Sequence, residues 1–173
     1  MAPRTTAFVE SSERFRHVLG HFPTGMVAVT AFDGEPVGLA VGSFSSISLD
    51  PPLVGFFVDR SSTTWPRIRR AGRFAVNVLG AHQEELCRRF GRKGMDRFAD
   101  VRWQPGLGDA PLIDGALAWI ECDLDEVLET GDHVLAIGAV RRLEVGEEGR
   151  PLIFFRGDFT RPVAPPRALE ASR

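Results

Sequence analysis

The spacing of apolar residues near the N-terminus predicts an amphipathic helix. Four apolar residues recur at the i, i+3, i+4 and i+7 positions of one helical face: Phe15, Val18, Leu19 and Phe22. Ser11 or Ser12 can cap the start of this helix, and Gly20 ends it. Similar patterns predict two further short helices, over residues 64–71 and 82–90.

Runs of β-branched and aromatic residues predict strands through the rest of the chain. Those runs cover residues 26–32, 37–48, 53–58, 74–79, 116–129, 133–145 and 152–155. Asp33-Gly34 separates the first two runs, and the turn over 129–132 separates the two longest, so each pair is predicted to form a hairpin. The pattern therefore predicts a mostly β protein with short helices, in which an antiparallel sheet closes into a barrel.

Length and composition indicate one globular domain. The 173 residues are 43% hydrophobic and 25% charged, which suffices for a single core. We expect an N-terminal arm over residues 1–14, the domain over 15–160 and a proline-rich tail over 161–173. The sequence carries no glycine-rich nucleotide-binding motif of the Rossmann or P-loop type.

Charge and cysteine content narrow the class of protein further. The formal net charge of −2 argues against a partner nucleic acid. No apolar run approaches the ~18 residues of a membrane span and no secretory leader is evident, so we expect a cytoplasmic protein without a membrane partner. Cys87 and Cys122 lack the spacing of metal ligands, which favours two reduced thiols and no metal site. The arginines at 67, 69, 70 and 73 are expected on a solvated helix face, with contact to a dinucleotide phosphate as the alternative.

The stretch between residues 36 and 70 carries the candidate binding chemistry. Alternation along a strand places the small residues Gly38, Ala40 and Gly42 on one face, which leaves a flat groove for a planar ligand. Ser61–Thr64 stand at the start of a helix, where hydroxyl and free N–H groups can bind an anion. These features predict a phosphorylated aromatic cofactor; a polar edge strand and ordinary helix capping are the alternatives.

Five short motifs occur in an order that is typical of one known family. They are FPTGM (22–26), GSFSSISLDPP (42–52), FAVNVL (74–79), GDH (131–133) and PLIFFRGDF (151–159). Together they resemble the flavin reductase domain, whose members have the FMN-binding split β-barrel fold with antiparallel Greek-key topology. Such proteins are the reductase components of two-component flavin-dependent monooxygenases. The resemblance implies an NAD(P)H:flavin oxidoreductase, usually a homodimer, that reduces FMN or FAD with NADH or NADPH and supplies a partner monooxygenase.

The resemblance also implies which residues contact the cofactors. The flavin ring would lie along Val41, Gly42, Ser43 and Phe44 and be bordered by Pro23, Thr24 and Met26. Its ribityl phosphate would be held by Ser43, Ser46, Asp59, Arg60, Ser61 and Ser62. The segment that begins with Asn77 and Leu79 would run beside the flavin. His133 would position the nicotinamide, and Arg156 and Phe159 would line the same mouth.

Hydride transfer between two flat rings requires their alignment more than it requires catalytic side chains. The sequence accordingly gives no certain catalytic residue. The last motif of the family often carries a tyrosine after Arg-Gly, whereas this chain has no tyrosine and offers Phe159. Stacking survives that change, but a phenolic hydrogen bond does not. Two alternatives stay open: a non-catalytic flavin-binding protein, and an FMN enzyme of the same fold that resembles pyridoxamine-phosphate oxidase.

Overall fold

The computed structural model describes residues 11–92 and 94–160, and the structural statements below concern these residues. Its helices are α1 (Ser12–Leu19), α2 (Trp65–Ala71) and α3 (Glu84–Gly91), with 3₁₀ turns at Ala81–Gln83 and Leu107–Asp109. The first six strands are β1 (Thr24–Gly25), β2 (Val27–Phe32), β3 (Pro36–Val41), β4 (Ser45–Leu49), β5 (Pro52–Asp59) and β6 (Arg73–Val78). The others are β7 (Trp103–Pro105), β8 (Pro111–Ile113), β9 (Ala118–Thr130), β10 (His133–Val145), β11 (Ile153–Phe155) and β12 (Asp158–Thr160).

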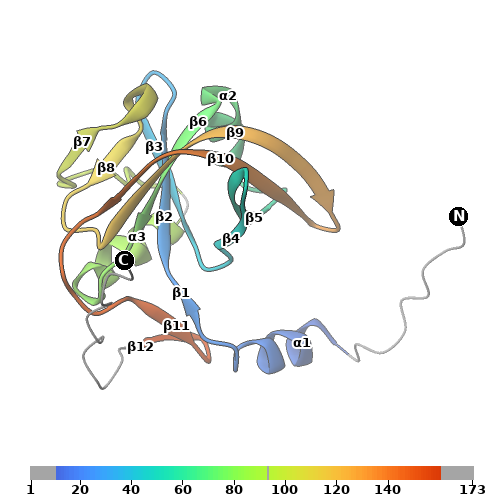
Figure 1. Cartoon of the computed structure of the whole chain (residues 1–173). Helices are drawn as coiled ribbons and strands as arrows, with labels where there is room; N and C mark the ends of the chain where they lie inside the picture. Colours follow the sequence, from blue (N-terminus) through green and yellow to red (C-terminus); the bar gives the residue numbers. More distant parts are fainter. Residues whose placement is uncertain (1–10, 93, 161–173) are drawn as a thin grey trace, which may run out of the picture.

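Seven of these strands form one antiparallel sheet in the order β3-β2-β6-β9-β10-β5-β4. The sheet curls strongly, so that β3 comes into contact with β5 across the open side of a barrel (Figure 1). Alternate residues of the strands point inward and form the main core, which includes Val29, Val41, Phe56 and Phe74. The predicted class, a mostly β protein with an antiparallel Greek-key split barrel, is confirmed.

Both predicted hairpins are present. Phe32 pairs with Pro36 at the end of the β2–β3 hairpin, where Gly34 has a φ of 75° that a glycine adopts without strain. Thr130 pairs with His133 at the tip of the β9–β10 hairpin. The arms of this second hairpin are the longest strands of the barrel and cross it from one side to the other (Figure 1).

The predicted single strand over 37–48 is wrong, because the chain changes its place in the sheet at residues 42–44. β3 pairs with β2 at one edge of the sheet, whereas β4 pairs with β5 at the opposite edge. The Ser43 hydroxyl joins the crossing chain to β5. Its oxygen accepts a hydrogen bond from Phe57 N at 3.0 Å, and its O–H donates one to Phe57 O at 3.0 Å. Alternation therefore describes residues 36–41 only.

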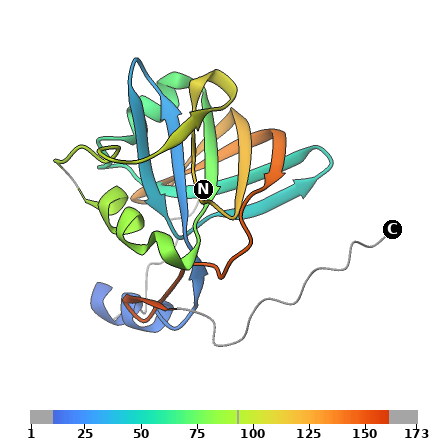
Figure 2. The same cartoon turned by 90° about the vertical axis from the view of Figure 1, so that its left-hand side faces the viewer.

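A second, smaller core lies between the barrel and α3. Leu79, Cys87, Phe90 and Leu152 are buried there, and Figure 2 shows α3 beside β3 on the outside of the barrel. The sequence does not predict the β7–β8 hairpin, which also borders this layer. Cys87 and Cys122 are free thiols, and burial raises their pKa values to about 11 and about 12.

α1 and the three-stranded sheet β1-β11-β12 lie together at one end of the barrel (Figures 1 and 2). Arg156 N donates to Gly20 O at 2.7 Å and ties the β11–β12 hairpin to the end of α1. The predicted N-terminal helix is confirmed, with Ser11 accepting a hydrogen bond from Arg14 N at 3.1 Å. None of its residues is buried, so its apolar face has no cover within the described part of the chain.

The predicted domain limits stay predictions. The tail over 161–173 and most of the arm over 1–14 lie outside the described residues, and α1 begins at Ser12, inside the predicted arm. Within the part that the structure describes, no helix has both the length and the apolar character that crossing a membrane requires.

Candidate functional site

Two cavities meet on the open side of the barrel next to α3. The first, here called the hydroxyl pocket, has a volume of about 240 Å³. It is lined by Leu39, Ala40, Val41, Phe57, Val58, Asp59, Ser61, Ser62, Thr63, Thr64, Phe90, Gly91 and Arg97. The second, the aromatic pocket, has about 550 Å³ and is lined by Met26, Ala40, Gly42, Cys87, Arg88, Gly91, Arg92, Phe154 and Phe159. Ala40 and Gly91 belong to both linings, so the two cavities adjoin.

The loop after β5 gives the hydroxyl pocket its polar wall. Asp59 Oδ1 accepts a hydrogen bond from Ser61 N at 2.7 Å, which holds the loop in a tight turn. Ser62 Oγ accepts from Trp65 N at 3.2 Å at the start of α2. An oxygen that accepts this bond keeps its own O–H for a second partner, so the Ser62 hydroxyl can donate into the pocket.

Small residues form the floor of the aromatic pocket. A Cβ atom added at Gly42 would lie 3.0 Å from Thr24 Oγ1 and 3.3 Å from Met26 Sδ, closer than ordinary van der Waals contact. Glycine is therefore the residue that lets Thr24 and Met26 approach the chain here. Ala40 and Gly42 both line this pocket, and the flat surface expected from the sequence stays a prediction.

Gly38 does not belong to this flat surface, which corrects the predicted groove. A Cβ at Gly38 would lie 2.6 Å from Cε1 of Phe90, because the Phe90 ring of α3 packs directly on β3. The space above Gly38 is thus filled by protein. The groove is shorter than predicted and starts at Ala40.

The β11–β12 hairpin closes the aromatic pocket from the other side. Phe159 contributes its ring, and Arg88 Cζ lies 4.6 Å from the centre of that ring. Arg88 Nη2 also donates to Asp158 Oδ1 at 3.0 Å and to Glu84 Oε1 at 2.9 Å. These contacts fix the hairpin to α3, so Phe159 is held in place as one wall of the cavity.

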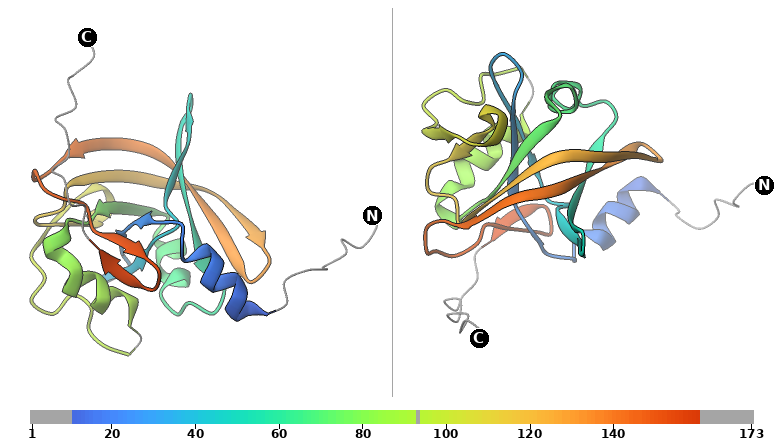
Figure 3. Two further views of the ribbon diagram at one scale, coloured as in Figure 1. Left: turned by 90° about the horizontal axis from the view of Figure 1, so that it is seen from below. Right: turned by 45° about the horizontal axis from the view of Figure 1, so that its top comes forward.

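His133 lies at the tip of the β9–β10 hairpin, opposite Asp59 of β5. Its Nδ1 is 2.7 Å from Asp132 Oδ1, and this hydrogen bond lowers the pKa of Asp132 below its usual value. The hairpin tip points away from β11 and β12, as Figures 1 and 3 show. Within one chain His133 therefore does not share a mouth with Arg156 and Phe159, and its predicted role stays a prediction.

Asn77 and Leu79 belong to the core, which corrects the predicted contact with a cofactor. Both are fully buried. Asn77 Nδ2 donates to Ala28 O at 3.0 Å and to Thr30 Oγ1 at 3.0 Å, and Asn77 Oδ1 accepts from Ile113 N at 2.7 Å. This network ties β6 to β2 and β8, so the amide has no free group to offer a ligand.

The other predicted residues divide into those near a cavity and those away from it. Thr24 packs against Gly42, and the partly buried Phe44 packs on the main core. Five residues are exposed and line neither cavity: Pro23, Ser43, Ser46, Arg60 and Arg156. Arg60 lies 3.7 Å from Glu129 in an exposed ion pair. Their predicted contacts with flavin or nicotinamide stay predictions.

The arginines around α2 pair with acidic side chains. Arg67 and Arg70 both donate to Asp33, and Arg73 donates to Asp123 at 3.0 Å. This arrangement supports the predicted solvated face in preference to a site for a dinucleotide phosphate. Among the described residues, no group of three histidine, cysteine or acidic side chains is placed to hold a metal ion.

The sequence did not reveal the contribution of α3 and the loop that follows it. Cys87, Arg88 and Gly91 line the aromatic pocket, and Arg97 lines the hydroxyl pocket. The signal that could have found them is the i, i+4 spacing of Cys87 and Gly91, which places both on one face of α3. Arg97 gives no such signal, because its place depends on the path of the loop.

A family model described as "Flavin reductase like domain" matches residues 19–162. A flavin reductase from Pseudomonas putida is 52% identical over 147 residues, which cover 84% of this chain and 86% of that protein. The reductase subunit HsaB of a flavin-dependent monooxygenase from Rhodococcus jostii is 45% identical, with 85% and 76% covered. The structure of the NADH:FAD oxidoreductase SgcE6 from Streptomyces globisporus superposes with a TM-score of 0.85 at 36% identity, covering 94% of this chain and all of that one.

These matches define the class of protein. The chain belongs to the flavin reductase-like domain family, and its barrel with two adjoining cavities is the family's split-barrel type. The resemblance drawn from the five sequence motifs is thereby confirmed.

Proposed function

We propose that this chain is an NADH-dependent flavin reductase that supplies reduced flavin to a separate monooxygenase. The similar proteins named above include a flavin reductase, a monooxygenase reductase subunit and an NADH:FAD oxidoreductase. A bound flavin would supply the redox chemistry by accepting a hydride from the reduced nicotinamide. The chain's own residues would bind and align the two molecules.

The observation that carries this proposal is the junction of the two cavities at Ala40 and Gly91. A phosphorylated flavin has an apolar ring at one end and a charged, polar chain at the other. The aromatic pocket offers small residues and aromatic side chains for the ring, and the hydroxyl pocket offers Ser61, Ser62 and Thr63 for the polar chain. The residues present therefore fit the cofactor.

Phe159 and Gly42 would align the rings. Gly42 and Met26 lie close together in the lining of the aromatic pocket, and Arg88 holds the Phe159 ring as another part of that lining. Two flat molecules held between these walls would lie face to face, which is the geometry that hydride transfer needs. Closing walls would also exclude water from the reacting atoms.

We further propose that the chain works as a homodimer in which the second copy covers α1. Three apolar residues of this helix, Phe15, Val18 and Leu19, are 50% to 57% exposed, and Phe22, just after its end, is 73% exposed. An isolated helix of eight residues is not stable in water without packing of its apolar face. A second copy would provide the missing cover at the end of the barrel where α1 lies beside β1, β11 and β12.

Sedimentation of the purified chain tests this assembly. The unsubstituted chain should sediment as a dimer, and Phe22→Glu should shift it toward the monomer because it buries a charge in the interface. A matched Leu143→Glu substitution, at an exposed apolar residue on β10, should leave the dimer intact. A monomeric unsubstituted chain would refute the proposal.

We also propose a cytoplasmic location, which suits a chain with two free thiols.

An anaerobic assay tests the reductase function itself. Purified chain mixed with NADH and either FMN or FAD should consume NADH only when flavin is present, as followed by the loss of nicotinamide absorbance. NADPH in place of NADH should react more slowly. Tight flavin binding without any NAD(P)H oxidation would instead favour a non-catalytic flavin-binding protein.

A further inference from the structure

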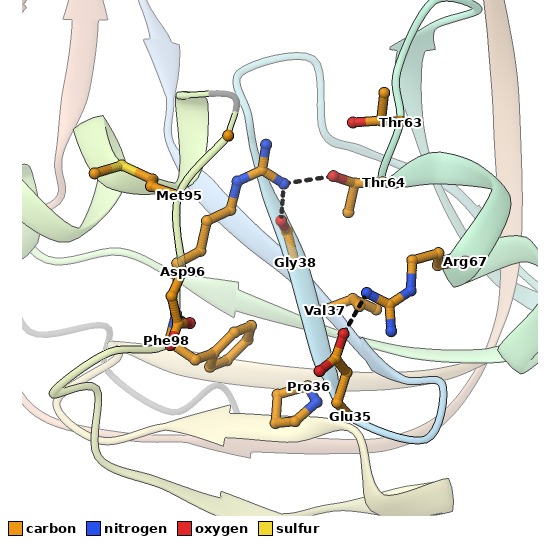
Figure 4. Close-up of a pocket in the computed structure, with 12 residues that line it drawn as sticks. Glu35, Pro36, Val37, Gly38, Thr63, Thr64, Arg67, Met95, Asp96 and Phe98 are labelled. Carbon is orange, nitrogen blue, oxygen red and sulfur yellow. Dashed lines mark hydrogen bonds and ion pairs between the residues drawn. The ribbon is translucent and has the colours of Figure 1, made fainter.

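Arg97 lies between two cavities and lines both of them. It lies on the loop after α3 and lines the hydroxyl pocket. It also lines a neighbouring cavity of about 680 Å³, the outer cavity, whose walls include Glu35, Gly38, Thr64 and Arg67. Arg97 Nη1 donates hydrogen bonds to Gly38 O and to Thr64 Oγ1. Figure 4 shows both bonds, from one guanidinium group to Gly38 and Thr64. The loop is thereby fixed against both β3 and the start of α2.

The charge of Arg97 has no acidic partner within the part of the chain that the structure describes. Its remaining hydrogen bonds go to Arg92 O, from Nε at 3.0 Å and from Nη2 at 2.7 Å. All its acceptors are therefore neutral carbonyl or hydroxyl oxygens. Asp96 and Asp59 lie nearby, but their Oδ1 atoms accept from the backbone N–H groups of Phe98 and Ser61.

Three arginines of the barrel, Arg67, Arg73 and Arg141, differ from Arg97 in this respect. Arg67 in the outer cavity donates to Glu35 Oε1 at 2.8 Å (Figure 4). It also donates to Asp33 Oδ2 at 3.1 Å. Arg73 and Arg141 both pair with Asp123. Arg97 alone among these carries a partly buried charge without a carboxylate. A half-desolvated cation of this kind is stabilised when an anion binds beside it.

The surroundings of Arg97 specify which anion fits. The hydroxyls of Ser61, Ser62 and Thr63 line the same pocket, and the Ser62 O–H is free to donate. A guanidinium with several hydroxyl donors matches the tetrahedral oxygens of a phosphate better than a planar carboxylate. Asp59 also lines this pocket, and its repulsion of an anion favours a position next to Arg97 and the hydroxyl donors.

We propose that Arg97 is the cationic ligand of the ribityl phosphate and makes the chain select phosphorylated flavins over riboflavin. This inference rests on the proposed flavin reductase function. It assigns the positive charge of the phosphate site to the loop after α3, whereas Arg60, the arginine expected from the sequence, faces Glu129 outside the pocket. Burial lowers the pKa of Arg97 from its usual value, yet an arginine side chain stays protonated at neutral pH.

Titration with FMN and with riboflavin tests the selection in the unsubstituted chain. Binding followed by quenching of flavin fluorescence should be stronger for FMN, and added sodium chloride should weaken FMN binding while leaving riboflavin binding nearly unchanged. Equal affinity for the two flavins would overturn the inference. This measurement needs no substitution, so it decides the question even if a variant fails to fold.

Substitution of Arg97 tests the assignment to this residue. Arg97→Met should raise the dissociation constant for FMN by about 10- to 100-fold, the loss expected for charge-assisted hydrogen bonds, and should change that for riboflavin little. Arg97→Lys should recover part of the difference. Arg67→Met is the matched control, because Arg67 is already paired and lines only the outer cavity. A loss of equal size for FMN and riboflavin in Arg97→Met would show a structural role and refute the proposal.

The outcomes separate this inference from the proposed function. If no flavin supports NADH oxidation, the reductase function fails. If riboflavin and FMN are bound and reduced equally well, the reductase function stands and the role of Arg97 fails.

Discussion

The hydroxyl pocket and the aromatic pocket share two residues but are built in different ways. Much of the polar wall of the hydroxyl pocket comes from consecutive residues between 59 and 64, and the pocket contains a guanidinium and several hydroxyls. The aromatic pocket draws on four separate segments, around Met26, Ala40, Arg88 and Phe159, and its lining combines small and aromatic residues with Arg88 and Arg92. Under the proposed function the two pockets would have separate tasks: the hydroxyl pocket would bind the charged end of the flavin, and the aromatic pocket would hold its flat ring.

The largest effect is expected from filling the aromatic pocket at its floor. Gly42→Val would push a branched side chain against Thr24 and Met26, because a Cβ at this position would lie 3.0 Å from Thr24 Oγ1 and 3.3 Å from Met26 Sδ, so this part of the pocket lining would have to shift. We expect kcat/KM to fall by about 100-fold, as for other small displacements of reacting groups. Steady-state NADH oxidation and flavin titration measure this loss, and a thermal melt checks that the chain stays folded.

Gly25→Ala is the steric control for that experiment, because a Cβ at Gly25 would meet no atom within 4 Å. Its rate should stay close to that of the unsubstituted chain. Normal turnover of Gly42→Val would show that the ring does not lie on this floor.

A smaller loss of activity is expected when the aromatic ring of Phe159 is removed from the lining of the aromatic pocket. Phe159→Leu removes the ring that Arg88 holds, and with it the aromatic stacking partner. We expect the Michaelis constants to rise by about 3- to 10-fold, the range given by one aromatic pair. Phe159→Tyr keeps the ring and should retain activity. If leucine and tyrosine behave alike, stacking at this position does not contribute.

His133→Ala tests a residue that lies in neither pocket of its own chain, and its expected effect on the kinetic constants is smaller still. If His133 positions the nicotinamide, the Michaelis constant for NADH should rise by about threefold through the loss of one hydrogen bond, with little change for flavin. Initial rates measured while each substrate is varied in turn separate the two constants. An equal rise in both constants would argue against the assigned role.

The contrast between the pockets also explains what could be predicted from the sequence. Ser61 and Ser62 act together because they are neighbours in the chain, so a local motif is enough to find them. The hairpins at Gly34 and Gly131 follow from local turn chemistry in the same way. Local patterns therefore gave the class of fold, most strands and part of one pocket.

The predictions that failed concern residues whose surroundings depend on contacts between distant segments of the chain. Strand alternation alone places Gly38 on the open groove, but Phe90 of α3 fills the space above it. Asn77 resembles a polar ligand, yet β2 and β8 use all of its hydrogen-bonding groups. Arg97 enters the hydroxyl pocket only because Gly38 and Thr64 hold its loop there. No periodicity encodes such contacts, because they arise when elements pack together.

The smallest effect on catalysis is expected at Asp33, which lies in neither pocket and so separates stability from function. Hydrogen bonds from Arg70 and then Arg67 lower the pKa of Asp33 to about 2, below the value of 3.8 for an unperturbed aspartate. The folded state thus favours the ionised form, and this stabilisation is present above pH 3.8 and is lost as the pH falls toward 2. Asp33→Asn should lower the melting temperature by a few degrees at pH 7, with a smaller difference near pH 2 and an unchanged kcat at neutral pH. Thermal melts across this pH range measure the effect, and a difference that grew toward pH 2 would contradict the assigned ion pairs.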